Sequence, residues 1–225
     1  MDIRQALISS TRVSLVAAAA LLAVAGSAQA AAGDIVVRGR VLQLEPANES
    51  YGPHAALAAD AITVSSRLIW ELDASYFLTN NLALEVIATT PPKHTVSTTA
   101  VPNGRLGTLR HLPPTLTLQY HIAPTNASVR PYLGFGVNYT HFSAVDLDAG
   151  PALGVGSLPL DIKRNSWGTA IQLGADFPIN DKLSINVDFK KIDISTKVSV
   201  KATGAYLGTV KVNPVLFGAG VGYKF

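Results

Sequence analysis

The sequence has 225 residues, with 18 Lys or Arg residues against 15 Asp or Glu residues and a formal net charge of +3. This near balance argues against a nucleic-acid partner, which would call for clustered basic charge. The sequence contains no cysteine, which excludes a disulfide framework and an N-terminal cysteine that could carry a lipid anchor.

Residues 1–30 have the pattern of a cleaved secretory signal peptide. Two arginines precede the apolar run at residues 13–25, and the small residues that a signal peptidase needs end at Ala30. The run holds about 13 residues, whereas a transmembrane helix needs about 20. We predict cleavage after Ala30, or alternatively after Ala32, which leaves one mature domain over residues 31–225.

The mature sequence is apolar but contains no run of 18 apolar residues, so it predicts no transmembrane helix. A closed β-barrel is the other structure that satisfies every backbone polar group inside a bilayer, and its strands need only about 9–11 residues each. Its signature is a repeated alternation of apolar and polar residues between turns.

This alternation recurs along the mature chain. In residues 67–78, Leu68, Trp70 and Leu72 fall on one face, whereas Glu71 and Asp73 fall on the other. The pattern predicts eight strands, over about residues 35–44, 67–78, 82–88, 115–122, 133–140, 167–177, 183–190 and 212–225. The expected fold is all-β: an eight-stranded antiparallel transmembrane β-barrel with four long extracellular loops.

The connections between these strands alternate in length. Short connections cover residues 79–81, 123–128 and 179–181, and long ones cover about residues 45–65, 94–111, 143–164 and 196–211. Outer-membrane barrels have short periplasmic turns and long outer loops, so both ends of the mature chain should lie on the periplasmic side. We expect little regular structure in the long loops, apart from a helical turn within residues 149–160.

The two strand faces distinguish a membrane barrel from a soluble carrier with an apolar interior. Large aromatic residues such as Trp70 and Tyr76 lie near both ends of the apolar face, which predicts two aromatic girdles at the membrane surfaces. The other face carries charges of both signs, such as Arg40 and Asp188, which can pair inside a narrow lumen. The apolar face should therefore contact lipid.

Several segments resemble the OmpW family of outer-membrane proteins. They are residues 33–38 (GDIVVR), 88–94 (ATTPPKH), 111–115 (HLPPT), 130–140 (RPYLGFGVNYT), 166–168 (SWG) and the aromatic C-terminus. Together these segments span nearly the whole mature chain, and their order and spacing are more specific than any one of them.

The resemblance implies an eight-stranded barrel in the outer membrane of a Gram-negative cell, with a narrow channel for small, often hydrophobic molecules and no cofactor. The partners it implies are the lipid bilayer and lipopolysaccharide, small apolar solutes, and the outer-membrane assembly machinery. The terminal Phe225 resembles the signal that this machinery reads in its clients.

Inward charges near the periplasmic end predict a plug. An eight-stranded barrel is barely wide enough for its own side chains. Arg38, Glu85, Arg130 and Asp176 lie within a few residues of a short turn or of the mature N-terminus. We expect ion pairs to close this end, so a wide, water-filled porin channel is not expected.

Two proline pairs occur at matching height on neighbouring strands. Pro91 and Pro92 follow one short turn, and Pro113 and Pro114 precede the next. Proline donates no hydrogen bond to a β-ladder and is tolerated only at edges or breaks. One interpretation is a lateral opening through which an apolar solute passes sideways into the membrane. The alternative is that the prolines simply end two strands and start a loop.

Ile87 and Lys190 are candidates for a constriction in the lumen. Ile87 has inward parity and matches an apolar lumen position in the family, although an ordinary packed interior residue explains it equally well. Lys190 matches a position that can hold a large aromatic residue in the family, which argues against a fully apolar gate. Ile192 and Ile194 share its parity, so either a β-bulge near Lys190 resets the faces or apolar side chains line the upper lumen.

The sequence offers little support for an enzyme, because it has no nucleophile elbow and no His and Cys cluster with metal-ligand spacing. His94 and His111 flank one loop, either as a metal pair or as two unconnected residues. We therefore predict no catalytic or metal site. The expected function is a narrow channel for small hydrophobic or amphipathic molecules; the alternative is a structural barrel whose loops serve adhesion, phage attachment or envelope integrity.

Overall fold

The computed structural model describes residues 30–52 and 60–225, so the predicted signal peptide, apart from Ala30, lies outside the described residues. Within them, the strands are β1 (Ile35–Glu45), β2 (Glu49–Tyr51), β3 (Ile62–Val64), β4 (Arg67–Phe77), β5 (Leu82–Thr89), β6 (Lys93–Thr98), β7 (Gly104–Leu112), β8 (Thr115–His121), β9 (Arg130–Asp148), β10 (Pro159–Ile162), β11 (Asn165–Pro178), β12 (Leu183–Ile192), β13 (Ser195–Val200), β14 (Tyr206–Lys211) and β15 (Val215–Lys224). One short helix, α1, covers Gly150–Leu153. No helix in the described residues has the length and apolar character needed to cross a membrane.

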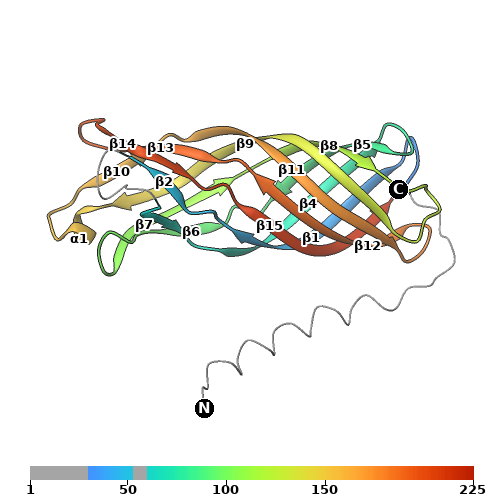
Figure 1. The fold of residues 1–225 in the computed structure, drawn as a ribbon, viewed down its shortest axis with the longest axis horizontal. Helices are drawn as coiled ribbons and strands as arrows, with labels where there is room; N and C mark the ends of the chain where they lie inside the picture. Colours follow the sequence, from blue (N-terminus) through green and yellow to red (C-terminus); the bar gives the residue numbers. More distant parts are fainter. Residues whose placement is uncertain (1–29, 53–59) are drawn as a thin grey trace, which may run out of the picture.

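Eight strands close a barrel in the order β1, β4, β5, β8, β9, β11, β12 and β15, and every neighbouring pair is antiparallel. The ring closes where β1 pairs with β15, from Val36 opposite Lys224 to Glu45 opposite Val215. Closure leaves this ring without a free strand edge, as a bilayer requires. The predicted fold class is confirmed (Figure 1).

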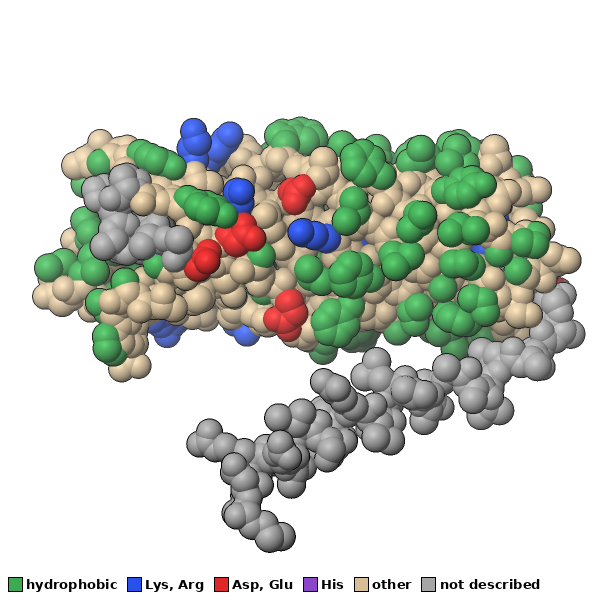
Figure 2. Space-filling model, viewed as in Figure 1, with side chains coloured by type: hydrophobic (Ala, Val, Ile, Leu, Met, Phe, Trp, Pro, Cys, Tyr) green, Lys and Arg blue, Asp and Glu red, His purple; other side chains and the backbone are tan. Residues whose placement is uncertain are grey.

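Side chains alternate between the lumen and the outer surface along these strands. On β4, Leu68, Trp70 and Leu72 are 69%, 66% and 60% exposed, whereas Glu71 and Asp73 are buried. We call the large exposed apolar residues of the eight strands the membrane band; it comprises Ile35, Leu68, Trp70, Leu72, Tyr76, Leu84, Val86, Leu116, Leu118, Tyr120, Leu133, Phe135, Val137, Trp167, Ile171, Leu173, Ile185, Val187, Phe189, Phe217, Val221 and Tyr223. Figure 2 shows hydrophobic side chains covering the half of the molecule nearer the C-terminus, with charged side chains gathered on the other half.

The long connections form a second ring of strands beyond the membrane band. Its order is β3, β6, β7, β9, β10, β13, β14 and β2, and β2 meets β3 where Ile62 N donates to Ser50 Oγ at 3.3 Å. The expectation of little regular structure in the long loops is therefore wrong. Pairing with one another satisfies the backbone groups of these segments. The helical turn predicted within residues 149–160 is present as α1.

The interior is polar near the periplasmic end and apolar beyond it. The buried apolar side chains of the upper lumen form one cluster, which includes Leu42, Ile69, Ile192 and Ile194. We call it the upper apolar cluster. The pairing of β12 with β11 and with β15 continues past Lys190 without a register shift. The β-bulge interpretation of this stretch is therefore wrong, and the alternative, in which apolar side chains line the upper lumen, is confirmed.

Candidate functional site

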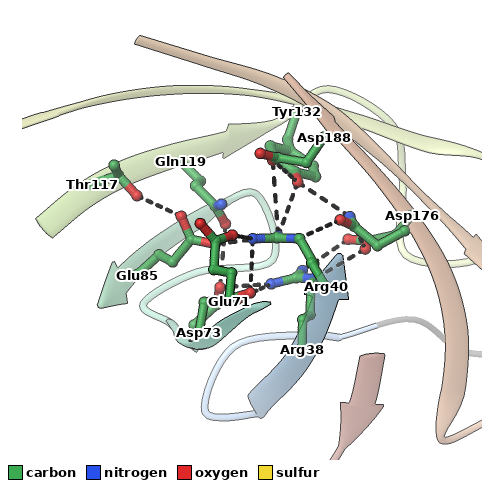
Figure 3. Close-up of polar contacts among 12 residues, drawn as sticks. Arg38, Arg40, Glu71, Asp73, Glu85, Thr117, Gln119, Tyr132, Asp176 and Asp188 are labelled. Carbon is green, nitrogen blue, oxygen red and sulfur yellow. Dashed lines mark hydrogen bonds and ion pairs between the residues drawn. The ribbon is translucent and has the colours of Figure 1, made fainter. Parts of the chain in front are cut away.

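The lower half of the lumen is filled by buried polar side chains from β1, β4, β5, β9, β11 and β12. We use the name polar network for Arg38, Arg40, Glu71, Asp73, Glu85, Tyr132, Asp176, Asn186, Asp188 and Lys190, all of which are at most 4% exposed. Each lies on the inward face of its strand because successive side chains of a strand alternate. Figure 3 shows the two arginines at the centre of the carboxylates.

Arg38 binds carboxylates from two other strands. Its Nε and Nη2 donate to Oδ1 and Oδ2 of Asp176 at 3.1 and 2.9 Å, and its Nη1 donates to Oδ1 of Asp73 at 3.2 Å. Nη1 also donates to Ser75 Oγ at 2.7 Å. Two parallel hydrogen bonds to one carboxylate are strong and geometrically specific. Arg38 therefore ties β11 to β1 and β4 across the lumen.

Arg40 compensates the buried carboxylates of β4 and β5. Its Nη1 lies 2.8 Å from Glu71 Oε1 and 2.7 Å from Asp73 Oδ2, and its Nη2 lies 3.4 Å from Glu85 Oε1. Its Nε donates to Asn186 Oδ1 at 2.7 Å. The side chain thus spans the lumen from β1 toward β12.

Lys190 lies at the upper boundary of the polar network. Its Nζ is 2.6 Å from Glu71 Oε1 and 2.5 Å from Asp188 Oδ1, and the Tyr132 hydroxyl donates to Asp188 Oδ2 at 2.7 Å. The next inward residue on β12 is Ile192 of the upper apolar cluster. Removing one partner of such a buried pair costs about 3–5 kcal/mol, because the other charge stays buried and unpaired.

Glycines make room for the long side chains of the polar network. A Cβ at Gly174 would lie 2.3 Å from Tyr132 Oη, and a Cβ at Gly220 would lie 2.8 Å from Arg40 Cγ. Both separations are too short for atoms that are not bonded to each other, so any larger residue would displace a member of the network. The glycine face of β15 therefore lets Arg40 cross the lumen.

Phe77 narrows the lumen below the polar network. Its ring centroid lies 4.9 Å from that of His121, and the guanidinium carbon of Arg130 lies 5.1 Å from the Phe77 centroid. All of these side chains are buried, so they pack against one another below the polar network.

The structure brings together three of the four residues predicted to plug this end. Arg38 and Asp176 form one ion pair, and Glu85 joins them through Arg40. Arg130 lies lower, outside these ion pairs. The role of the four residues as a plug stays a prediction.

Sequence reasoning identified other inward charges but assigned them no place in the plug, and it did not identify Tyr132. Tyr132 has the same parity as Gly134 and Gly136 on β9, and this parity could have identified it as an inward-facing residue. No sequence signal could have placed its hydroxyl against Asp188, because the two residues come from strands that are not neighbours in the sheet.

Ile87 is buried beside the polar network rather than among the apolar residues above it. It lies opposite Asp73 on β4 and Thr115 on β8, and it is not a member of the upper apolar cluster. Lys190 is nearer to that cluster, at the boundary described above. The assignment of Ile87 and Lys190 to a constriction stays a prediction.

A cavity of about 260 Å³, which we call the upper cavity, lies in the upper lumen. It is lined by Val, Leu and Ile side chains of β3, β6, β7, β10, β13 and β14 and by Phe142 of β9, and its described lining includes no Asp, Glu, Lys or Arg. This volume is close to the lower end of the range for small-ligand pockets, which are also largely apolar. The cavity is therefore suited to a small apolar molecule.

His94 and His111 stack on each other above the membrane band, with ring centroids 4.8 Å apart and an interplanar angle of 16°. His111 also lines the upper cavity. Burial lowers the pKa of His111 to about 3 and also lowers the pKa of His94, so both rings are neutral at neutral pH. The described residues contain no group of three or more His, Cys, Asp or Glu side chains placed to hold a metal ion.

The two proline pairs lie on opposite sides of an interruption in strand pairing, offset from each other along the strands. The ladder between β5 and β8 ends at Ile87 opposite Thr115, and the ladder between β6 and β7 begins at Lys93 opposite Arg110. Between these positions, the described segments 88–92 and 113–114 form no ladder pair with each other. We call them the proline seam. Arg110 Nη1 crosses the seam to Pro91 O at 3.4 Å.

Phe225 follows β15 at the closing edge of the barrel. Its backbone N donates to Ile35 O at 2.9 Å, its side chain is 71% exposed, and its ring centroid lies 4.8 Å from that of Tyr223. These contacts connect it to the seam between β1 and β15. Its role as an assembly signal stays a prediction.

Comparison of the sequence with known proteins places this chain in a family. The sequence profile of the OmpW family matches residues 31–225. Outer membrane protein W of Vibrio cholerae is 34% identical over 198 residues, which cover 86% of this chain and 89% of that protein. The dibenzothiophene metabolism operon protein PahQ of Pseudomonas aeruginosa is 29% identical over 161 residues, which cover 68% of this chain and 69% of that protein.

A solved structure supports the same grouping. The crystal structure of the outer membrane protein OprG from Pseudomonas aeruginosa has a TM-score of 0.73 and 32% sequence identity, and the match covers 88% of this chain and 98% of the OprG chain. The likeness therefore extends over the whole barrel, including the strands beyond the membrane band.

Proposed function

Because this chain belongs to the OmpW family of outer-membrane proteins, we propose that it carries small hydrophobic or amphipathic molecules from the outside into the outer membrane. The solute enters the upper cavity and leaves sideways through the proline seam. The observation that carries this proposal is an apolar cavity in the upper lumen, with a buried network of paired charges in the lower lumen.

The polar network blocks the straight route along the barrel axis. A solute that moved past Lys190 would meet five carboxylates and three cations that are already paired with one another. Entry of an apolar molecule would separate these pairs, and each uncompensated buried charge costs several kcal/mol. An apolar solute in the upper cavity is therefore favoured to leave by another route.

The proline seam offers that route at the lower end of the cavity. Proline has no N–H with which to close the ladder, and the flanking strands are held from their other sides, where Thr90 N donates to Trp70 O at 3.0 Å and Tyr139 N donates to Pro114 O at 3.1 Å. The seam can therefore widen without the loss of a ladder hydrogen bond across it. Leu109 and His111 of β7 connect the cavity to this region.

A relative's name agrees with an apolar solute. PahQ is named for a dibenzothiophene metabolism operon, and dibenzothiophene is a fused aromatic molecule without a charge. The chemistry of the cavity lining suits such solutes, because it contributes apolar surface and no charged group.

Replacement of the proline pairs tests the proposal. Pro91, Pro92, Pro113 and Pro114 are changed together to Thr, which restores the missing N–H groups, and uptake of a fluorescent apolar solute into the membrane of proteoliposomes is measured. We expect slower uptake than in the wild-type protein. The control is Pro124→Thr in a short turn on the opposite end of the barrel. Unchanged uptake in the fourfold variant would exclude the lateral route.

The same proteoliposomes test the alternative of a structural barrel. Single-channel conductance and solute uptake are both recorded for the wild-type protein. Uptake above that of empty liposomes supports transport. A barrel that gives neither current nor uptake would instead favour a structural or interaction role for the strands beyond the membrane band.

A further inference from the structure

The upper cavity has one polar side chain whose hydrogen bonding is incomplete. Its polar lining consists of Thr98, His111 and Thr196. Thr196 Oγ1 donates to Lys163 O at 2.7 Å, and Thr98 Oγ1 accepts a hydrogen bond from Ala100 N at 3.2 Å. His111 is 1% exposed, and its Nε2 has no hydrogen-bond partner among the described residues. A polar group that is buried without a hydrogen bond loses its hydration with no compensating interaction.

His94 adds a second unsatisfied atom beside the first. Its Nδ1 lies 2.6 Å from Ser65 O. A carbonyl oxygen can only accept, so Nδ1 carries the proton and the Nε2 of the neutral ring is an acceptor. This Nε2 is also buried without a partner among the described residues. The stacked pair therefore presents hydrogen-bonding capacity that the protein itself leaves unfilled.

We propose that the upper cavity selects small amphipathic molecules with one neutral hydroxyl group, such as an aliphatic alcohol or a phenol, and that this hydroxyl binds His111 with His94 as a second partner. The apolar part of the ligand packs against Phe142 and the surrounding aliphatic side chains. This inference rests on the proposed function, because it names the class of solute that the same cavity prefers.

Hydrogen-bonding chemistry separates the hydroxyl from the other candidates. A hydroxyl can donate to one Nε2 and accept from another N–H. A hydrocarbon would leave the histidine atoms unpaired. A carboxylate would present acceptors only, and it would be buried against a lining with no Lys or Arg. The pair of rings therefore favours a neutral group that both donates and accepts.

Binding of three matched probes tests this selectivity. The probes are 1-octanol, n-octane and octanoate, each titrated into the full protein in lipid nanodiscs. The shifts of methyl-labelled Leu and Val residues report cavity occupancy, and the ¹⁵N shifts of the histidine rings report the head group. The variants are His111→Phe, which keeps an aromatic ring, and His111→Gln, which keeps a hydrogen-bonding group. The matched control is His141→Phe, because His141 is exposed and binds Asn165 instead.

In the wild-type protein we expect 1-octanol to bind with the His111 ring nitrogen shifted. In His111→Phe, the affinity for 1-octanol relative to n-octane should fall by about tenfold, the size of one buried hydrogen bond. His111→Gln should restore part of the preference, and His141→Phe should not change it. Comparison between variants cancels the partition of each probe into the lipid.

Two results would overturn the inference in distinguishable ways. Equal relative affinities in the wild-type protein and in His111→Phe would refute the role of the histidine pair while leaving the cavity as a site for apolar solutes. If none of the three probes changes the methyl shifts, the proposed function and the inference are both refuted. A heat-modifiable shift in gel migration verifies that each variant is folded.

Discussion

Arg38 and Asp176 are 138 positions apart in the sequence, yet their side chains form two parallel hydrogen bonds inside the lumen, at 3.1 and 2.9 Å. Arg38 also binds Asp73 at 3.2 Å. One guanidinium therefore holds together strands from the beginning, the first third and the last third of the chain. We therefore expect the stability of the lower lumen to depend on this pairing.

Neutralising Asp176 should destabilise the barrel strongly. Asp176→Asn leaves Arg38 buried with one fewer charge partner, so the free energy of unfolding in lipid vesicles should fall by about 3 kcal/mol. The matched control is Asp161→Asn, which breaks the exposed pair with Arg164 at 3.0 Å and should cost no more than about 1 kcal/mol. Equal losses for the two variants would contradict the importance of burial.

A methyl group at Gly174 should displace Tyr132. Its Cβ would lie 2.3 Å from the Tyr132 hydroxyl oxygen, and overpacking of this kind costs about 1–3 kcal/mol. Urea unfolding of Gly174→Ala measures the loss. Gly39→Ala is the control, because a Cβ at Gly39 would meet no atom within 4 Å. If both variants are as stable as the wild-type protein, the lower lumen is less crowded than the structure indicates.

Opening the polar network should let ions through. The double variant Arg40→Ser with Glu71→Ser removes one buried cation and one buried anion, which leaves the net charge of the network unchanged and frees volume in the lumen. Single-channel conductance in planar bilayers should rise severalfold. The corresponding exterior variant, Arg164→Ser with Asp161→Ser, should have the conductance of the wild-type protein. A double variant as closed as the wild-type protein would show that Arg40 and Glu71 are not needed for the barrier.

Acidification should destabilise the upper ring through His111. Burial lowers its pKa to about 3, whereas the unfolded side chain has a pKa of about 6.5. The unfolded state therefore binds the extra proton between these values, and stability falls as the pH decreases from about 6.5 toward 3. Between pH 7 and pH 4.5 the loss should be about 2.5 kcal/mol.

His111→Phe provides the comparison, because its unfolding free energy should change less over the same pH range. The neighbouring His94, whose pKa burial also lowers, stays in both proteins and contributes the same background. Parallel pH curves for the two proteins would show that His111 does not carry this dependence.

The inward and outward faces could be predicted from the sequence because alternation along a strand is a local property. The exposure of Leu68, Trp70 and Leu72 and the burial of Glu71 follow directly from a period of two. The strands beyond the membrane band were missed because they are short and pair with one another or with the outer end of β9. Their Ser, Thr and Gly residues also match a loop by composition, as in Ser195–Val200.

The sequence by itself determined the number of barrel strands, the side of each strand that meets lipid, and the family. The first two properties depend on residue spacing along single strands, and the family is indicated by the order of short segments along the chain. Only the tertiary structure decided which charges meet, that His94 stacks on His111, and that an apolar cavity lies above Lys190. Partners across a lumen are set by the stagger and closure of the whole sheet, and this information is spread over all eight strands rather than contained in any one of them.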